Sequence, residues 1–319
     1  MRLFIAFLLL IAVSVLHLIS PLPPLFEAWR IDPALGHTLL IELRLPRTLL
    51  ALGYGATLGI SGAALQALFA NPLASPDITG SSSVAAMGAV FGAYWLGIAS
   101  PLLLALCGAL GAGIALAVLL VIAGRRTDKV GMLLAGIAVS LAAGAATSLL
   151  LALAPSPFAF YDSFEWLMGS FVDRSLGQAA AALVPAAIAC ALLLRRSRAL
   201  DLMVLGDDVL ASLGHQPRRI GIEIVGLSAV AVGACVSVCG AIGFVGLIAP
   251  VVARWMVRGH PGRALAPAGL IGALLLLLAD LAVRSVALDH AIPVGVLTTL
   301  IGTPVFIAIL LSMRGRMAS

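Results

Sequence analysis

The chain has 319 residues, of which 62% are hydrophobic and only 10% are charged, and its mean hydropathy is +1.15. Soluble domains carry about 25% charged residues, so this composition excludes a soluble enzyme. A helix that crosses a membrane needs about 20 apolar residues, and a chain of this length can hold about ten such helices with little left for an extramembrane domain. We expect a single all-α transmembrane domain over residues 1–319.

Ten apolar stretches follow one another along the chain, and they define the predicted spans. The first one follows Arg2 and could pass for a signal peptide, but no A-x-A cleavage site comes after it, so we interpret it as a retained span. Some of the later stretches are short for a full crossing. The ten cover residues 3–20, 47–70, 79–98, 101–123, 130–153, 178–194, 220–242, 244–257, 265–288 and 294–313.

The basic residues between these stretches predict the orientation of the chain. The net charge of +5 comes from 18 arginines and one lysine against 14 acids, and their positions follow the spans, so nucleic-acid binding is not implied. With Arg2 inside, 14 basic residues lie on the cytoplasmic side and five lie outside, which is the positive-inside bias of an inner-membrane protein. We therefore predict a multi-pass protein of the bacterial inner membrane with both termini in the cytoplasm and the long loop 154–177 outside.

The chain lacks the motif with which it could bind ATP itself. A Walker A loop requires Gly-Lys followed by Ser or Thr, whereas the single lysine, Lys129, follows Asp128. Ion-coupled transporters usually carry acids inside their spans, and here Asp280 is the exception among nearly acid-free spans. It lies four residues before Arg284, so the two side chains share a helix face and can pair. We expect a transporter without ATPase activity, energised by another subunit; the alternative is an ion-coupled secondary transporter that acts alone.

Glycines recur at short spacings, for instance at Gly55, Gly59 and Gly62, which predicts close backbone contacts between helices. Two segments also share a pattern. Ser61–Pro72 reads SGAALQALFANP and Cys239–Pro250 reads CGAIGFVGLIAP, so each has a Gly-Ala pair and a proline ten residues after the glycine. With the first segment running towards the cytoplasm and the second away from it, this match is interpreted as an inverted repeat of the two halves.

Three motif regions occur in a familiar order: LRLPRTLLALGYGATLGISGAALQALFANPLASPDITG (Leu43–Gly80), GFVGLIAPVVARWM (Gly243–Met256), and LLLLLADLAVR with IPVGVLTTLIGTPVFI (274–284 and 292–307). They resemble the permease subunits of bacterial iron-siderophore, haem and cobalamin ABC importers, the FecCD-type family. The resemblance covers the chain from about residue 40 to its end. It implies ten transmembrane helices, a homodimer or a pair of similar permeases, two cytoplasmic ATP-binding subunits and a periplasmic substrate-binding protein that docks from outside.

The resemblance gives roles to three arginines at the expected outer mouth, Arg44, Arg47 and Arg284. We expect them at helix ends that face the external water, and in the family arginines at these motif positions accept glutamates of the binding protein. The planar guanidinium pairs bidentately with a carboxylate, which fits that role. The alternative is that these side chains only extend to the membrane interface.

At the expected cytoplasmic end of the second span, Asn71-Pro72-Leu73 stops the helix, because Pro72 cannot continue the hydrogen-bond ladder and Asn71 can bond to freed backbone groups. A plain helix stop explains this pattern equally well. In the family the matching loop lies at the cytoplasmic gate of the pathway, so the resemblance makes Asn71 and Leu73 the gate candidates.

The stretch RRSRALDLMVLGDDVLASLGHQPRRIG after the sixth span is too polar to cross a membrane. Its apolar residues recur at helical intervals and Gly206 and Gly214 interrupt them, which predicts two short amphipathic helices. Such a pair suits either a partner groove or an anionic membrane surface. In the family the matching element couples the permease to its ATPase, so the resemblance assigns residues 201–215 to coupling. The named candidates are Leu205, Gly206, Asp207, Asp208, Leu213 and Gly214.

Two further points follow from the residues. The family pattern G-F-V-G-L-I-x-P usually continues with histidine, whereas this chain has Val251, so no role of that histidine can be transferred. No two of the five histidines have a metal-ligand spacing, and we expect neither a metal site nor a cofactor in the chain. The residues do not identify the transported chelate; iron-siderophore is the commonest substrate of the family and the default expectation, ahead of haem and cobalamin.

Overall fold

The computed structural model describes residues 2–98, 100–123, 129–214, 216–286 and 292–317, and every regular element in this part of the chain is a helix. The bounds are α1 (Arg2–Ile19), α2 (Leu22–Ile31), α3 (Pro33–Thr38), the π-helix η1 (Leu39–Arg44), α4 (Leu45–Leu68), α5 (Ser81–Val90), the π-helix η2 (Phe91–Trp95), α6 (Pro101–Ala123), α7 (Lys129–Ala152), α8 (Pro157–Leu167), α9 (Leu176–Arg195), α10 (Ser197–Leu202), the 3₁₀ turn η3 (Met203–Leu205), α11 (Asp207–Ser212), α12 (Pro217–Cys239), α13 (Val245–Met256), the 3₁₀ turn η4 (Gly262–Ala264), α14 (Leu265–Val286) and α15 (Val294–Met317).

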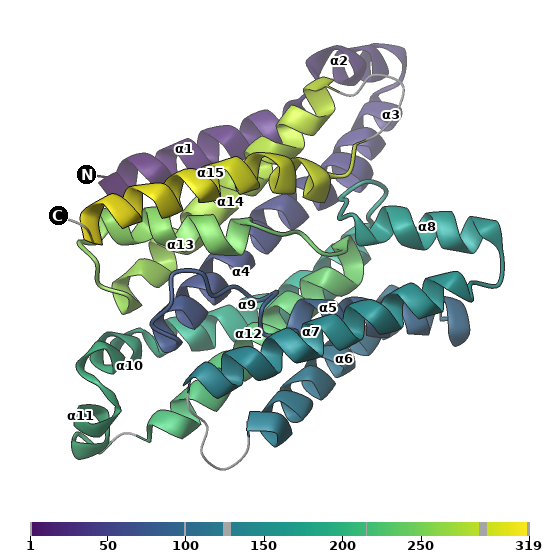
Figure 1. Cartoon of the computed structure of the whole chain (residues 1–319). Helices are drawn as coiled ribbons and strands as arrows, with labels where there is room; N and C mark the ends of the chain where they lie inside the picture. Colours follow the sequence, from purple (N-terminus) through teal and green to yellow (C-terminus); the bar gives the residue numbers. More distant parts are fainter. Residues whose placement is uncertain (1, 99, 124–128, 215, 287–291, 318–319) are drawn as a thin grey trace.

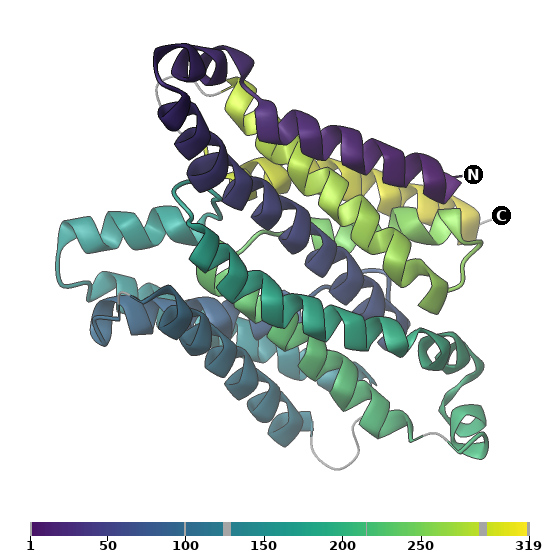
Figure 2. The ribbon, with the colours of Figure 1, turned by 180° about the vertical axis from the view of Figure 1, so that it is seen from behind.

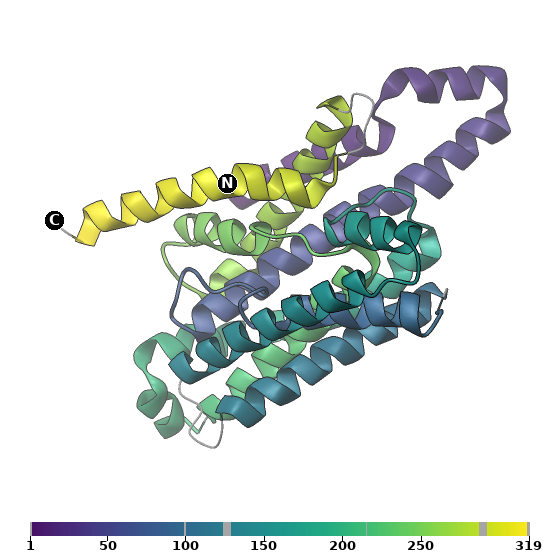
Figure 3. The same ribbon diagram turned by 45° about the vertical axis from the view of Figure 1, so that its right-hand side comes forward.

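The long helices form one bundle with two distinct ends. The beginning of α1, the end of α15 and the short helices α10 and α11 lie at one end, which we call the α11 end (Figure 1). The helices α2, α3 and α8 lie at the opposite end, the α8 end, and views from behind and from the side agree (Figures 2 and 3). Both chain ends therefore lie on the side of the bundle that carries α10 and α11.

The central helix α4 packs along α14 with unusually short backbone separations. A Cβ atom on Gly59 would overlap the carbonyl oxygen of Ala268, and one on Gly55 would contact Gly272 in the same way. Lipid provides no hydrophobic force between helices, so such contacts gain their stability from dispersion between closely packed backbones. The predicted close packing at these glycines is confirmed.

The predicted spans correspond to helices, but their ability to cross a membrane differs. Within the described residues, six helical segments are long and apolar enough to cross a membrane, and a seventh results if α1 and α2, which meet at a 51° bend, count as one. Val245–Met256 and Val294–Ile309 are apolar but shorter. The structure thus supports a multi-pass all-α membrane protein. The six segments are Pro33–Leu68, Leu102–Leu119, Gly131–Ala152, Leu176–Arg195, Pro217–Cys239 and Gly262–Ser285.

The interpretation of an inverted repeat is wrong for the two matching segments. Gly62 of α4 lies against Gly246 of α13, and Gln66, further along α4, bonds to Leu247 and to Arg254, further along α13. The two helices therefore run in the same direction. The two matched glycines have different neighbours, because Gly62 meets Gly246 of α13, whereas a Cβ atom on Gly240 would overlap the carbonyl oxygen of Trp166.

Three short helices at the α8 end were not predicted. The chain forms α2 and α3 before the second span and α8 within the loop 154–177. These segments are too short or too polar to register as spans, and α8 carries acids between exposed aromatic side chains such as Phe158 and Tyr161. Short interfacial helices escape a search for 20-residue apolar runs because only one face of them is apolar.

Candidate functional site

At the α8 end, charged side chains from three helices converge on Asp280 of α14, whose side chain is 1% exposed. Arg47 of α4 donates from Nε to Oδ2 at 2.8 Å and from Nη2 to Oδ1 at 2.9 Å, which is a bidentate pair. Arg284 donates from Nε to Oδ2 at 3.0 Å, one turn along α14, as predicted for this pair. His17 of α1 adds a bond from Nε2 to Oδ2 at 2.8 Å, and its Nδ1 lies 2.8 Å from the Thr48 hydroxyl.

Arg44 and Arg284 also hold the end of α1. Arg44 donates to the carbonyl oxygens of Ile19 at 2.6 Å and Pro21 at 2.8 Å. Arg284 Nη1 donates to the carbonyl oxygens of His17 and Ser20, each at 3.1 Å. The last turn of a helix has carbonyl groups without an intrahelical partner, and these guanidinium groups satisfy them. We call Arg44, Arg47, Arg284, Asp280 and His17 the arginine cluster.

The expectation that the three arginines face external water needs correction. Arg44 is only 7% exposed, and the side chains of Arg47 and Arg284 are 20% and 11% exposed. Asp280 and the free carbonyls of α1 draw the guanidinium groups into the bundle, because a buried charge requires partners. Arg47 Nη1 has no hydrogen bond to any described residue, so one donor of the cluster is free of an internal partner.

At the α11 end, the segment 70–80 turns back into the bundle after α4. Ala70 has a φ of 48°, and Asn71 Oδ1 accepts a hydrogen bond from the Leu73 amide at 2.9 Å. This is the predicted bond from Asn71 to a freed backbone group. Further along, the Ser140 hydroxyl of α7 donates to the carbonyl oxygen of Asp77 at 2.6 Å, so the segment is attached to α7.

A polar contact beside this segment joins α4 to α13. Gln66 is buried; its Nε2 donates to the Leu247 carbonyl oxygen at 3.1 Å, and its Oε1 accepts from Arg254. Val251, where the family pattern usually has histidine, is buried on the same helix as Arg254. A glutamine inside a span is held by such pairs because hydrocarbon offers no other partner.

The predicted pair of short helices is present as α10, η3 and α11; residue 215, at the end of the predicted element, lies outside the described residues. Gly206 and Gly214 have φ values of 98° and 81°, which only glycine adopts without strain, so the predicted breaks are confirmed. The Gly262 amide donates to Asp201 Oδ1 at 2.8 Å and attaches α10 to the rest of the bundle.

This element has one buried and one uncovered apolar face. Leu200 and Leu210 are fully buried against the bundle. Leu205 and Leu213 are 59% and 55% exposed, and Val204 and Val209 are exposed beside them, as is the Asp208 side chain. These four exposed aliphatic side chains form an apolar surface that no described residue of the chain covers.

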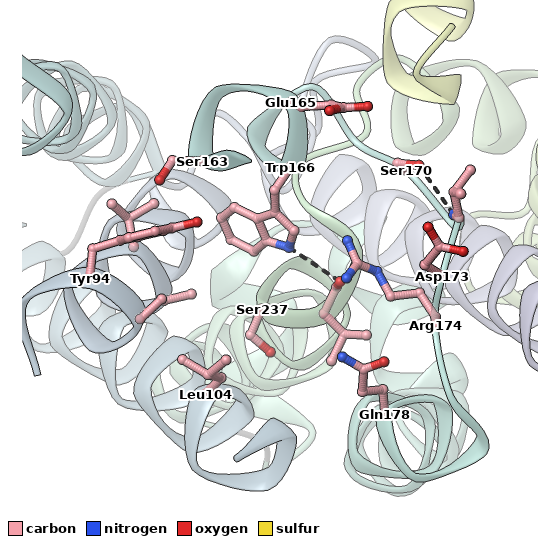
Figure 4. Close-up of a pocket in the computed structure, with 15 residues that line it drawn as sticks. Tyr94, Leu104, Ser163, Glu165, Trp166, Ser170, Asp173, Arg174, Gln178 and Ser237 are labelled. Atoms are coloured by element: carbon pink, nitrogen blue, oxygen red, sulfur yellow. Dashed lines mark hydrogen bonds between the residues drawn. The ribbon is translucent and has the colours of Figure 1, made fainter. Parts of the chain in front are cut away.

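A polar pocket of about 350 Å³ lies at the α8 end, between η2, α8 and the end of α12 (Figure 4). Trp166 Nε1 donates to the Val238 carbonyl oxygen at 3.2 Å and joins α8 to α12 across the pocket. The Arg174 guanidinium extends into it, and its Nε is buried without a hydrogen-bond partner among the described residues. No sequence pattern predicts this pocket, because its walls come from segments that lie far apart in the chain.

Comparison with known proteins identifies the group to which this arrangement belongs. A model of the FecCD transport family matches residues 3–312. The chain belongs to the FecCD transport family. The family resemblance inferred from the motifs is therefore confirmed, and the match extends to α1, which the motifs did not cover.

The FecCD relatives are permeases with different cargo names. The Fe(3+) dicitrate permease FecD of Escherichia coli (strain K12) is 34% identical over 303 residues, 94% of each chain. The hemin permease HmuU of Yersinia pestis is 36% identical over 285 residues, 86% of this chain and 83% of that protein. The vitamin B12 permease BtuC of Vibrio cholerae is 35% identical over 293 residues, 88% of this chain and 84% of that protein.

A solved FecCD-like structure agrees with the fold. It is an inward-facing conformation of a metal-chelate type ABC transporter, 31% identical, with a TM-score of 0.86, covering 98% of this chain and 99% of that one. Like these relatives, the present FecCD chain is a transport permease of the membrane, and permeases of this kind are not themselves ATPases.

The three predicted arginines lie together in the structure, with one further residue that the sequence analysis did not single out. Arg44, Arg47 and Arg284 meet at the α8 end, and Asn71 and Leu73 lie near the α11 end, as do α10 and α11. His17 was not singled out, although it bonds directly to Asp280. His17 is the one titratable residue in the predicted first span, 3–20, and that is the signal that could have found it.

Proposed function

We propose that this chain forms the membrane path of an ATP-driven importer for a metal chelate. Iron(III) citrate, hemin and vitamin B12, the cargoes in the relatives' names, share one chemistry, a metal ion held by an organic ligand. By default the cargo is an iron-siderophore, with haem or cobalamin as the other members of this class. The binding protein selects the chelate, and two cytoplasmic ATP-binding subunits drive its passage through a pair of permeases, by default a homodimer.

The observation that carries this proposal is the uncovered apolar face of η3 and α11. Leu205 of η3 and Leu213, directly after α11, are exposed beside helices that pack on the bundle through Leu200 and Leu210. A short helix fixed on one side and apolar on the other suits insertion into a groove of another protein. We assign residues 201–215, including Gly206, Asp207, Asp208 and Gly214, to coupling with the ATPase.

The orientation follows from charge and from the position of the chain ends. The α11 end contains most of the basic residues and the beginning of α1 and the end of α15, so it faces the cytoplasm. The ten predicted stretches then cross in sequence, with both termini inside. The 12-residue helix α13 completes its crossing because neighbouring helices cover the backbone where a span is broken.

The α8 end then faces outward and receives the binding protein. Arg44, Arg47 and Arg284 shape this surface, and the free Nη1 of Arg47 is available for a carboxylate of the partner. At the opposite end, Asn71 and Leu73 form the cytoplasmic gate. Their segment is attached to α7 through Ser140, so a movement of α7 displaces the gate.

The test is purification of the permease in mild detergent, followed by mass spectrometry of copurified proteins and an ATPase assay. We expect an ATPase subunit whose activity rises when a chelate-loaded binding protein is added. Leu205→Asp with Leu213→Asp should abolish copurification, whereas Leu176→Asp, the same change at the α8 end, should leave it intact.

Two outcomes would contradict these proposals. A stable preparation without an ATPase that accumulates chelate in liposomes under an ion gradient would show a secondary transporter. Normal copurification of the double aspartate variant would disprove the coupling role of α10 and α11 while leaving the importer in place.

A further inference from the structure

A groove of about 590 Å³ opens between α9 and α12 at the α11 end, on the face of the bundle seen in Figure 2. The part of the groove nearer the α11 end is lined by charged side chains, and the part further along the bundle is apolar. The lining residues are Leu192, Arg195, Arg196, Glu223, Gly226 and Leu227. None of these residues belongs to the proposed coupling, docking or gating sites.

The polar wall of the groove has an excess of positive charge. Arg196 Nη2 lies 2.6 Å from Glu223 Oε2, and Arg219 Nε lies 3.4 Å from Glu223 Oε1, so one carboxylate serves two arginines. Arg195 and Arg218 form no ion pair within the described part of the chain. Arg195 and Arg196 thus line the groove with Glu223 as the single lining acid, and Arg219 lies beside that acid.

The apolar wall continues away from these charges along the bundle. Val184, Ile188 and Leu192 are all exposed and lie four residues apart on α9, so they form one stripe that ends at Arg195. Val230, one turn beyond Gly226, is exposed on the α12 side. The stripe is about two turns long, and it places hydrocarbon surface and guanidinium groups in the order in which a phospholipid presents its chain and its headgroup.

We propose that this groove is a binding site for an anionic glycerophospholipid of the cytoplasmic leaflet. The phosphate lies between Arg195 and Arg196, because guanidinium groups bind phosphate oxygens bidentately. One acyl chain follows Val184, Ile188 and Leu192. The apolar stripe lies along the side of the bundle and not beyond its end, which favours a lipid over the ATPase as occupant. Basic pockets between transmembrane helices at this membrane face bind anionic headgroups.

The site also adjoins the coupling element at both ends. The helix α9 leads into α10 through Arg196, and α12 follows α11. A lipid held between α9 and α12 therefore fixes the two helices that precede and follow the coupling element in the chain. The lipid site goes beyond the proposed transport function. Lipid binding is measured directly and does not depend on a transport assay.

The experiment is native mass spectrometry of the full permease, with its copurified partners, titrated with phosphatidylglycerol or phosphatidylcholine. We expect retained phosphatidylglycerol and little phosphatidylcholine. Arg195→Gln with Arg196→Gln should weaken phosphatidylglycerol binding roughly 30-fold, since each arginine near an anionic headgroup contributes about fivefold. Glu223→Gln should strengthen it about fivefold by releasing Arg196 and Arg219. An increase in affinity cannot come from misfolding.

The matched control is Arg258→Gln with Arg263→Gln, which removes the same charge from exposed positions at the same end of the bundle. Equal weakening by this control would show a general electrostatic attraction and overturn the site. Equal binding of the two lipids would also overturn it. Displacement of the lipid by inorganic phosphate at equal concentration would show a free-anion site, and absence of lipid from the wild-type protein would show that another protein surface covers the groove.

Discussion

The arginines at the two ends of the bundle have opposite environments. At the α8 end, Arg44, Arg47 and Arg284 are largely buried and bonded to Asp280 or to carbonyl oxygens of α1. At the α11 end, the arginines around Glu223 are exposed and share that single carboxylate. A buried guanidinium needs an acceptor in the protein to offset its lost hydration, whereas an exposed one is solvated and free to meet a partner.

This difference in burial separates two roles of arginine in the protein, one in holding the fold together and one in attracting other molecules. The arginine cluster joins α1, α4 and α14 into a fixed unit, so its geometry contributes mainly to structure and presents few free donors outward. The exposed arginines contribute little to the stability of the fold, and their charge acts on molecules outside the chain. The following variants test this contrast, from the largest expected effect to the smallest.

Asp280→Ala should have the largest effect on stability. It leaves Arg47, Arg284 and His17 buried without their shared acceptor, which costs about 3–5 kcal/mol. The measurement is denaturant-induced unfolding of the purified chain in detergent. Asp208→Ala, the removal of an exposed carboxylate at the α11 end, should change the free energy of unfolding by less than about 0.5 kcal/mol. Equal losses of unfolding free energy in the two variants would contradict the contrast between the buried and the exposed charges.

Leu213→Asp should weaken binding to the ATPase subunit without altering the fold. Its side chain is exposed, and a contact at the centre of an interface contributes about 2 kcal/mol or more to association. Copurification yield and thermal unfolding measure the two properties separately. Leu210→Asp, three residues earlier and fully buried, should unfold the element instead. If Leu213→Asp lowers thermal stability as much as Leu210→Asp does, the exposed face is structural.

Arg47→Lys should lower the free energy of unfolding by about 1–2 kcal/mol, because an ammonium keeps the charge but loses the bidentate pair with Asp280. Unfolding by denaturant measures this change. Arg219→Lys is the counterpart at the α11 end, where the pair with Glu223 is longer and exposed. It should have no measurable effect on stability, and a comparable loss there would remove the distinction between the two ends.

Glu223→Gln should have only a small effect on stability, about 0.2–1 kcal/mol, since its ion pairs are exposed to water and screened by salt. The loss should disappear when unfolding is measured in about 1 M salt, where the Debye length is about 3 Å. A loss that is independent of salt would show that Glu223 is a buried structural acid, like Asp280.

The helical spans, the ion pair of Asp280 with Arg284 and the two short helices around Gly206 were all predictable from local pattern. Each depends on residues a few positions apart, which share a helix face or a turn. The pairing of Asp280 with His17 and Arg47 was not predictable, because 263 and 233 residues separate these partners in the chain. The direction of α13 beside α4 was misjudged for the same reason.

The sequence by itself determined that this chain is a membrane protein of the FecCD type, with most of its basic charge outside the spans, because hydropathy and motif spacing are properties of neighbouring residues. Only the tertiary structure decided which charges are buried and which are free. Three arginines expected at the surface lie inside because Asp280 and the end of α1 meet them there. Burial depends on which helices pack together, and that is set by contacts between distant parts of the chain.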